Sequence, residues 1–212
     1  LTHNFKNKTI MKKVLLTAVA VFSLTFVNAQ EEKETTGVGF SKGDVFITGA
    51  VGFGTSSTGD FKANGFTVSP SVGFFVNENI ALGARLGFNS TTEDDTVTED
   101  KSTEFSAGVF GRYYFTPASQ FSIFAELGAE INNTKFESTT GPFTSESKSN
   151  GFGIAFAPGV NYFISDKFSI EATWGVLGYS TSKPDVDGAE STDNFSLGLD
   201  MTSLNFGLTY KF

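Results

Sequence analysis

Side chains that commonly carry out chemistry are scarce in this chain. It contains no Cys, and its only His is His3, which precedes the first methionine, Met11. The commonest general base, thiolate nucleophiles and the commonest transition-metal ligands are therefore missing after Met11. Glu126 and Glu130 lie four residues apart, but such a carboxylate pair is too general to indicate a glycosidase. The sequence predicts a protein that is not an enzyme and has no cofactor.

Calcium binding is the second chemistry for which the sequence contains a candidate motif. Asp185-Val186-Asp187-Gly188 resembles part of a calcium-binding loop, but the full spacing and the closing Glu are absent. Solvated acidic segments that oppose aggregation are the commoner explanation. We therefore predict no specific metal site, and we keep weak divalent-cation bridging to anionic surface glycolipid as an alternative.

A third group of charged residues recurs at the period of a β-strand. Each lies where large apolar side chains alternate with small or polar ones, on the small or polar face. Because buried charges must be paired, we predict an ion-pair network that plugs an interior, with Arg112 and Glu126 as neighbours. A narrow ion or solute path with the same lining is the alternative. The group comprises Arg85, Glu104, Arg112, Glu126, Glu130 and Glu171.

These charges would have to be positioned by strands. Eight segments alternate between apolar residues and small or polar residues, as strands with two different faces do. Their apolar faces are continuous and rich in Phe, whereas the opposite faces are too small to form an apolar core. This pattern favours a narrow barrel with lipid outside and a tight polar interior. The predicted fold class is all-β, an eight-stranded antiparallel transmembrane up-and-down β-barrel. The segments are residues 45–53, 66–76, 80–88, 105–115, 121–131, 152–162, 168–176 and 204–212.

The connections between these segments alternate between short and long. Residues 77–79, 116–120 and 165–167 form short turns, and the remaining links are long loops, about 54–65, 89–103, 132–150 and 179–195. Short periplasmic turns and long extracellular loops are typical of outer-membrane barrels. Two of the long loops, 89–103 and 179–195, are strongly acidic. The sequence therefore predicts an outer-membrane location in a Gram-negative-type cell.

The start of the chain agrees with export. Met11-Lys12-Lys13 precedes an apolar run over residues 14–27, and Val27-Asn28-Ala29 fits a cleavage site. We predict an upstream extension or scar at 1–10, a signal peptide at 11–29, a flexible periplasmic segment at 30–43 and the barrel at 44–212. Without residues 1–29 the chain keeps 11 basic and 23 acidic side chains, a net charge of −12. Such an acidic chain is not expected to bind nucleic acid.

These features resemble the small outer-membrane β-barrel proteins of the OmpA and OmpX type, often called porin-like. The resemblance covers residues 44–212 and rests on the signal peptide, the eight strands, the alternating loop lengths and the Tyr210-Lys211-Phe212 end. It implies outer-membrane lipid as a partner and barrel-assembly machinery as a partner during biogenesis. It also implies that one strand face is the C-terminal assembly signal, namely Leu204, Phe206, Leu208, Tyr210 and Phe212.

Two functional hypotheses follow. The first is a structural or surface-interaction role, in which the long acidic loops contact an unknown surface ligand. The second is a narrow pore or a solute-binding, porin-like barrel.

One irregularity affects the last strand. Phe195, Leu197, Leu199 and Met201 lie at odd positions, whereas the apolar face from Leu204 onward lies at even positions. A bulge near residues 200–203 would restore the alternation. Otherwise the first half of this strand is a ribbon standing above the membrane.

Overall fold

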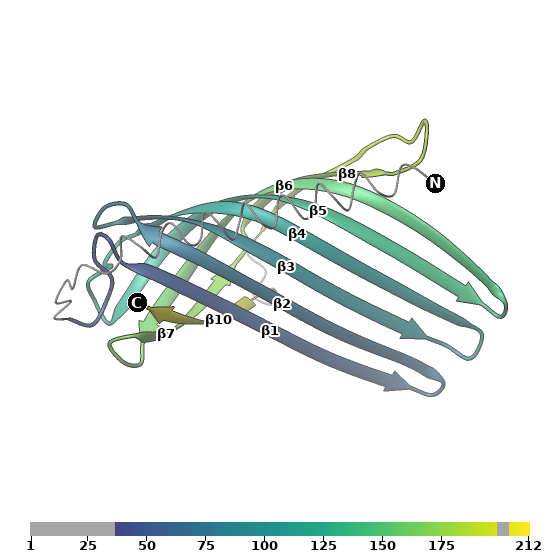
Figure 1. Cartoon of the computed structure of the whole chain (residues 1–212), viewed down its shortest axis with the longest axis horizontal. Coiled ribbons are helices and arrows are strands. Elements are labelled where there is room, and N and C mark those ends of the chain that lie inside the picture. Colours follow the sequence, from purple (N-terminus) through teal and green to yellow (C-terminus); the bar gives the residue numbers. More distant parts are fainter. Residues whose placement is uncertain (1–36, 199–203) are drawn as a thin grey trace. The chain divides into compact units, whose positions relative to one another are not determined.

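The computed structural model describes residues 37–198 and 204–212. The chain separates into two units, Leu1–Thr36 and Gly37–Phe212, and the barrel is the second unit. The predicted upstream extension, signal peptide and residues 30–36 lie outside the described residues. Every regular element that the structure describes is a β-strand (Figure 1). Within these two described ranges, no helix is long and apolar enough to span a membrane.

Ten strand segments occupy eight positions around the barrel. The seventh position is shared by β7 and β8 and the eighth by β9 and β10, because β8 pairs with β9 and β7 pairs with β10. The bounds are β1 (Val45–Thr58), β2 (Phe61–Phe75), β3 (Ile80–Asp94), β4 (Thr98–Tyr114), β5 (Phe121–Thr140), β6 (Phe143–Phe163), β7 (Phe168–Trp174), β8 (Leu177–Pro184), β9 (Thr192–Leu197) and β10 (Leu204–Lys211).

Antiparallel pairing between the first and last strands closes the barrel. β1 pairs with β10 from Phe46 opposite Lys211 to Gly49 opposite Leu208, and the Phe212 amide donates to the Val45 carbonyl at 3.0 Å. The predicted eight-stranded antiparallel barrel is thus confirmed. The closure is short, because residues 50–58 of β1 have no partner on this side among the described residues.

The predicted long loops are mostly hydrogen-bonded hairpins. β5 and β6 pair without interruption from Phe121 opposite Tyr162 to Thr140 opposite Phe143, so only Gly141 and Pro142 remain between them. Gly141 has a φ of 56°, in the left-handed region that a tight hairpin turn requires and that glycine adopts at no steric cost. These two strands therefore continue well beyond the predicted segments 121–131 and 152–162. Figure 1 shows the β1–β2, β3–β4 and β5–β6 hairpins reaching the end opposite the short turns.

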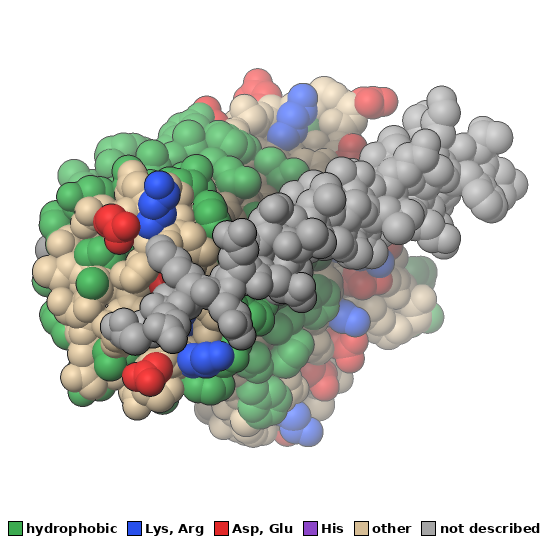
Figure 2. All heavy atoms as spheres, turned by 60° about the vertical axis from the view of Figure 1, so that its left-hand side comes forward, with side chains coloured by type: hydrophobic (Ala, Val, Ile, Leu, Met, Phe, Trp, Pro, Cys, Tyr) green, Lys and Arg blue, Asp and Glu red, His purple; other side chains and the backbone are tan. Residues whose placement is uncertain are grey.

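Outward side chains form the predicted apolar wall. Phe53, Val109 and Ile131 have exposed fractions of 77%, 62% and 62%, although each is large and apolar. In the face that Figure 2 presents, hydrophobic side chains spread over the wall, and acidic and basic side chains lie toward the ends. Such a surface would be costly in water and is stable in lipid.

A β-bulge interrupts the seventh position. Gly159 of β6 pairs with Thr173, and Phe156 pairs with Leu177, so two residues of β6 face the three residues 174–176. The extra residue moves the outward face from even to odd positions. The predicted single alternation from 168 to 176 is therefore wrong beyond Trp174.

β9 has its outward face at odd positions, as β8 does. Phe195 and Leu197 of β9 pair with Tyr179 and Leu177, which places the odd positions of β9 on the outward face. The outward face of β10 carries even positions, such as Phe206 and Leu208. The change between them falls at residues 199–203, outside the described residues, so the bulge near 200–203 stays a prediction.

The lumen is filled with aromatic rings at the short-turn end. We call this cluster the floor, and none of its members is more than 4% exposed. The prediction that inward faces are too small for an apolar core is wrong at this end. Three rings lie opposite a glycine of the neighbouring strand, which leaves room for them. The floor consists of Phe40, Phe46, Phe75, Ala81, Phe110, Tyr114, Phe124 and Phe163.

Candidate functional site

A layer of charged side chains lies on the floor inside the barrel. Arg85 comes from β3, Arg112 from β4, Glu126 from β5 and Glu171 from β7. Arg112 and Glu126 are directly opposite each other in neighbouring strands. Glu171 belongs to a strand that does not neighbour β4, so its pairing with Arg112 crosses the lumen.

Arg112 is the centre of this layer. Its Nε donates to Glu126 Oε2 at 2.6 Å, while Nη1 and Nη2 donate to the two carboxylate oxygens of Glu171 at 2.8 and 3.0 Å. Nη1 also donates to the Tyr114 hydroxyl at 3.2 Å. All four side chains are buried. A planar guanidinium that binds one carboxylate with two parallel bonds is among the strongest and most directional polar contacts in proteins.

The floor and the charged layer form one packed unit. The Arg112 guanidinium carbon lies 4.5 Å from the Phe124 ring centroid, 4.9 Å from that of Phe110 and 5.7 Å from that of Phe46. Cations favour such positions near aromatic rings. Arg112 is therefore held by carboxylates at its donors and by aromatic rings of the floor.

Arg85 occupies the cavity side of the layer. Its Nη2 donates to Glu126 Oε1, and its guanidinium lies 4.8 Å from the Phe110 ring centroid. About a third of the side chain remains exposed, at 33%. Its Nε is buried and has no hydrogen-bond partner among the described residues.

Hydroxyl groups connect the charged layer to the closing strands. Thr209 of β10 donates to Glu171 Oε2 at 3.3 Å, and its Oγ1 lies 2.7 Å from Thr48 Oγ1 of β1. Both threonines are buried at the four-pair closure. The layer thus supports the closure from inside.

The remaining two members of the predicted network lie elsewhere. Glu104 accepts hydrogen bonds from Asn132 Nδ2 at 3.3 Å and Thr134 Oγ1 at 3.2 Å. Glu130 lines the cavity, and its carboxylate forms no hydrogen bond or ion pair within the part of the chain that the structure describes. The structure therefore brings together Arg85, Arg112, Glu126 and Glu171, but neither Glu104 nor Glu130 joins them.

Sequence reasoning missed the aromatic members of the site. Phe74-Phe75, Tyr113-Tyr114 and Tyr162-Phe163 are doublets, in which one ring must face lipid and the other the lumen. The second residue of each doublet is a buried floor residue. These doublets were the available signal, because the aromatic belts at the two membrane surfaces require aromatic residues only on the lipid-facing side.

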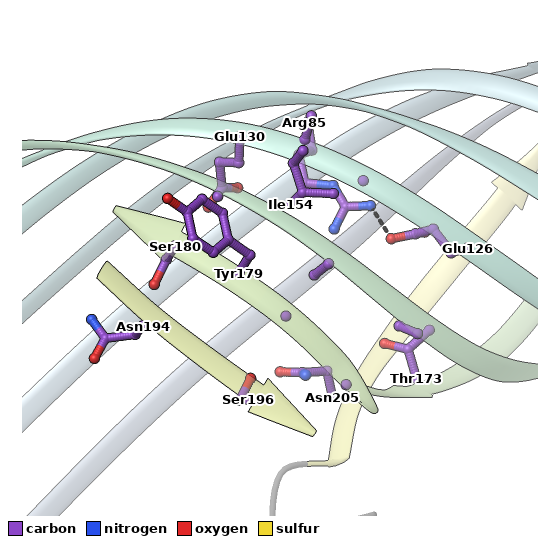
Figure 3. A pocket seen from close by; sticks show the side chains of 17 residues that line it. Arg85, Glu126, Glu130, Ile154, Thr173, Tyr179, Ser180, Asn194, Ser196 and Asn205 are labelled. Carbon is purple, nitrogen blue, oxygen red and sulfur yellow. Dashed lines mark hydrogen bonds and ion pairs between the residues drawn. The ribbon is translucent and has the colours of Figure 1, made fainter. Parts of the chain in front are cut away.

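Two adjoining cavities lie on the other side of the charged layer. They measure about 560 and 360 Å³, and Arg85, Glu126 and Glu130 line both. Figure 3 shows the smaller cavity, with the Arg85–Glu126 ion pair at its wall and Ser180, Ser196 and Asn205 among its polar lining residues. In the two described ranges no three His, Cys, Asp or Glu residues are placed to hold a metal ion. The cavities can hold water or a small polar solute.

A second charge cluster lies on the exposed β5–β6 hairpin. Lys135 Nζ is 2.9 Å from Glu137 and 3.0 Å from Glu146, and Lys148 Nζ is 2.9 Å from Glu146. Hydrogen bonds from Lys148 and then Lys135 lower the pKa of Glu146, and those to Glu137 and Glu146 raise the pKa of Lys135. The charges of this hairpin therefore balance one another.

Together these observations define a class of protein. A closed up-and-down barrel with an apolar outer wall and a polar, packed interior is a transmembrane β-barrel. The chain belongs to the family of the outer membrane protein β-barrel domain, whose model matches residues 15–212. Its location is the outer membrane, with the short turns in the periplasm and the long hairpins outside the cell.

Solved outer-membrane proteins have a similar fold. A major outer membrane protein from Thermus thermophilus is 11% identical, with a TM-score of 0.50, covering 80% of this chain and 98% of that one. Ail, the attachment invasion locus protein of Yersinia pestis, is 14% identical, with a TM-score of 0.47 and coverage of 81% and 99%. OprG from Pseudomonas aeruginosa is 15% identical, with a TM-score of 0.46 and coverage of 82% and 98%. No curated protein matches the chain.

Proposed function

We propose that this protein has a structural and surface-interaction role, performed by the hairpins that extend from the barrel. The observation that carries the proposal is the contrast between the two ends. The floor and the charged layer fill the lumen at the periplasmic end, while paired strands continue outside to residues 140 and 143. A filled lumen does not favour the alternative of a narrow pore. The scarcity of chemical side chains supports a role without catalysis.

The charge of the hairpins suggests the kind of surface that they would meet. The β3–β4 hairpin carries Glu93, Asp94, Asp95, Glu99 and Asp100 against the single Lys101. Amide groups of Val97 and Thr98 donate to Asp95 Oδ1 at 2.9 and 2.8 Å, and these hydrogen bonds lower the pKa of Asp95. This carboxylate therefore keeps its charge in moderately acidic surroundings. Complementarity favours a basic surface as the partner.

Shortening the β3–β4 hairpin should weaken binding to a basic surface without unfolding the barrel. Ser90 is paired with Thr103, so replacement of residues 91–102 by Asn-Gly retains the register and restores a tight turn. We expect proteoliposomes carrying this variant to lose most of their adhesion to a polylysine-coated surface in dilute buffer. Added salt should reduce the adhesion of the unmodified protein in the same way. Heat-modifiable migration on a gel reports whether each variant folds.

The β5–β6 hairpin provides a matched control. Asn133 is paired with Asn150, so replacement of residues 134–149 by Asn-Gly removes a hairpin with balanced charges. We expect this variant to adhere nearly as well as the unmodified protein. Equal losses from the two shortenings, or none from either, would contradict the proposed role of the acidic hairpin.

We also propose that the outward face of β10 is read during assembly. Tyr210 packs against Phe168 and Phe212, with ring centroids 5.0 Å apart in both pairs. Phe212→Ala keeps the amide that donates to Val45, so the refolded barrel should lose no more than about 1 kcal/mol of stability. In cells, we expect the amount of this variant in the outer membrane to fall severalfold. Phe53→Ala, another exposed position on the lipid face, is the control, and an equal effect of both would refute the signal.

A further inference from the structure

Residues 37–43, which we call the strap, pack against the floor of the barrel through Phe40 and Val38. Phe40 is 1% exposed at the centre of the floor. Its ring centroid lies 4.8 Å from those of Phe75 and Phe163, 5.3 Å from that of Phe46 and 5.4 Å from that of Tyr114. Phe40 is the only floor residue that does not come from a barrel strand. The predicted flexible segment at 30–43 thus includes residues that pack on the floor, and its flexibility stays a prediction.

One attachment point of the strap lies at the turn between β4 and β5. The Phe40 amide donates to the Pro117 carbonyl at 2.7 Å. Gly39 has a φ of 117°, and a Cβ at this position would lie 2.5 Å from the Ala118 carbonyl carbon. Only glycine allows this backbone conformation and this close approach.

The other attachment point lies at the closure between β1 and β10. Lys211 Nζ donates to the Gly39 carbonyl, lies 4.0 Å from Asp44 Oδ2 and is 5.4 Å from the Phe163 ring centroid. Asp44 Oδ2 in turn accepts from the Ser41 amide at 2.8 Å. Lys211 is only 3% exposed, so this lysine acts as a buried latch.

Both contacts are made by the peptide between Gly39 and Phe40, and the two elements that supply them, the β4–β5 turn and β10, lie on opposite sides of the barrel. Around the ring of eight positions, the β4–β5 turn is halfway from the β1–β10 closure. From Gly39, which lies against the β4–β5 turn, the strap runs to the start of β1 at the closure and so crosses the periplasmic mouth. It forms no strand, and the pairs that close the wall begin at Phe46, after the strap ends. The wall does not depend on the strap for its strand pairing.

We propose that the strap is a releasable gate, which closes the periplasmic mouth when Phe40 is seated and gives the periplasm access to the floor when Phe40 withdraws. The inference is independent of the role proposed for the outer hairpins. The strap is held by the Phe40 ring, by Val38 packed against the floor, by the Lys211 latch and by a few backbone hydrogen bonds, including one from the Gly43 amide to the Phe75 carbonyl at 2.9 Å. The wall around it is a hydrogen-bonded sheet.

Cysteine accessibility tests the gate directly, because the chain has no Cys of its own. Ser169 is fully buried, accepts a hydrogen bond from Asn161 at 2.9 Å, and is paired with Phe163, which contacts Phe40. The S169C protein should react slowly with a small, charged methanethiosulfonate reagent. Adding Phe40→Ala should accelerate the reaction at least about tenfold, because the substitution removes the central ring of the floor.

Two further variants make the test decisive. Phe53→Ala in the S169C background removes an exposed ring on the lipid face and should leave the rate unchanged. Lys211→Met keeps the floor rings but removes the latch, and should also accelerate the reaction. Heat-modifiable migration establishes that each protein is folded. Unchanged rates for both strap variants, or a rate for S169C alone as fast as that with Phe40→Ala, would overturn the proposal.

Discussion

Replacing Arg112 by methionine should lower the free energy of unfolding by roughly 3–5 kcal/mol, because two carboxylates would remain buried with fewer cationic partners. Glu126 would keep Arg85, but Glu171 would lose both of its bonds to a guanidinium and would retain only the Thr209 hydroxyl. Methionine has a similar length and can pack against the floor rings. The expected loss therefore reports on charge rather than on a cavity.

A double variant separates the charge effect from the packing effect. Adding Glu171→Gln to Arg112→Met removes the stranded carboxylate and leaves the Arg85–Glu126 pair intact. We expect the double variant to recover at least half of the lost stability, since replacing both partners of a buried pair is often nearly neutral. Urea unfolding in lipid vesicles, followed by Trp174 fluorescence, measures both proteins. A double variant as unstable as Arg112→Met alone would show that packing against the floor, not charge, makes Arg112 important.

Period-2 alternation was sufficient to predict the barrel but not the contents of its periplasmic end. On the lipid face every second residue must be apolar, so each strand gives independent evidence for the barrel. The lumen has no such uniform solvent. Gly73 and Phe75 are both inward-facing residues of β2. Gly73 leaves room for the Phe46 ring, whereas Phe75 places its own ring in the floor. The register between neighbouring strands decides which small residue lies opposite which ring. The sequence of one strand alone does not specify this register.

The strap was missed for a related reason. A short segment with glycines at 37, 39 and 43 reads as flexible, and nothing local predicts that the Phe40 ring enters the barrel. Its position is determined by rings from four different strands and by Lys211, at the far end of the sequence. The pairing of Arg112 with Glu126 was predictable because those strands are neighbours. The pairing with Glu171 crosses the lumen and was not.

Glycines opposite the floor rings should be among the least replaceable residues of the barrel. A Cβ on Gly83 would lie 2.2 Å from Phe110 Cζ and 2.4 Å from the Val72 carbonyl oxygen. A Cβ on Gly159 would lie 2.3 Å from Phe124 Cζ, and the three atoms nearest to it would all belong to the Phe124 ring. We expect each Gly→Ala substitution to cost about 2–3 kcal/mol in urea unfolding. Gly54→Ala, with open space around it, should instead be neutral or stabilising by up to about 1 kcal/mol.

The source of each clash predicts which substitution can be rescued. Phe124→Leu shortens the side chain that supplies the three atoms nearest to a Cβ at residue 159, so Gly159→Ala combined with Phe124→Leu should cost clearly less than the sum of the single changes. Phe110→Leu cannot move the Val72 carbonyl, so the same combination at Gly83 should remain close to additive. Equal rescue at both glycines would mean that the strands shift to accommodate the methyl group. In that case the close packing of rings on glycine backbone would not be what fixes the floor.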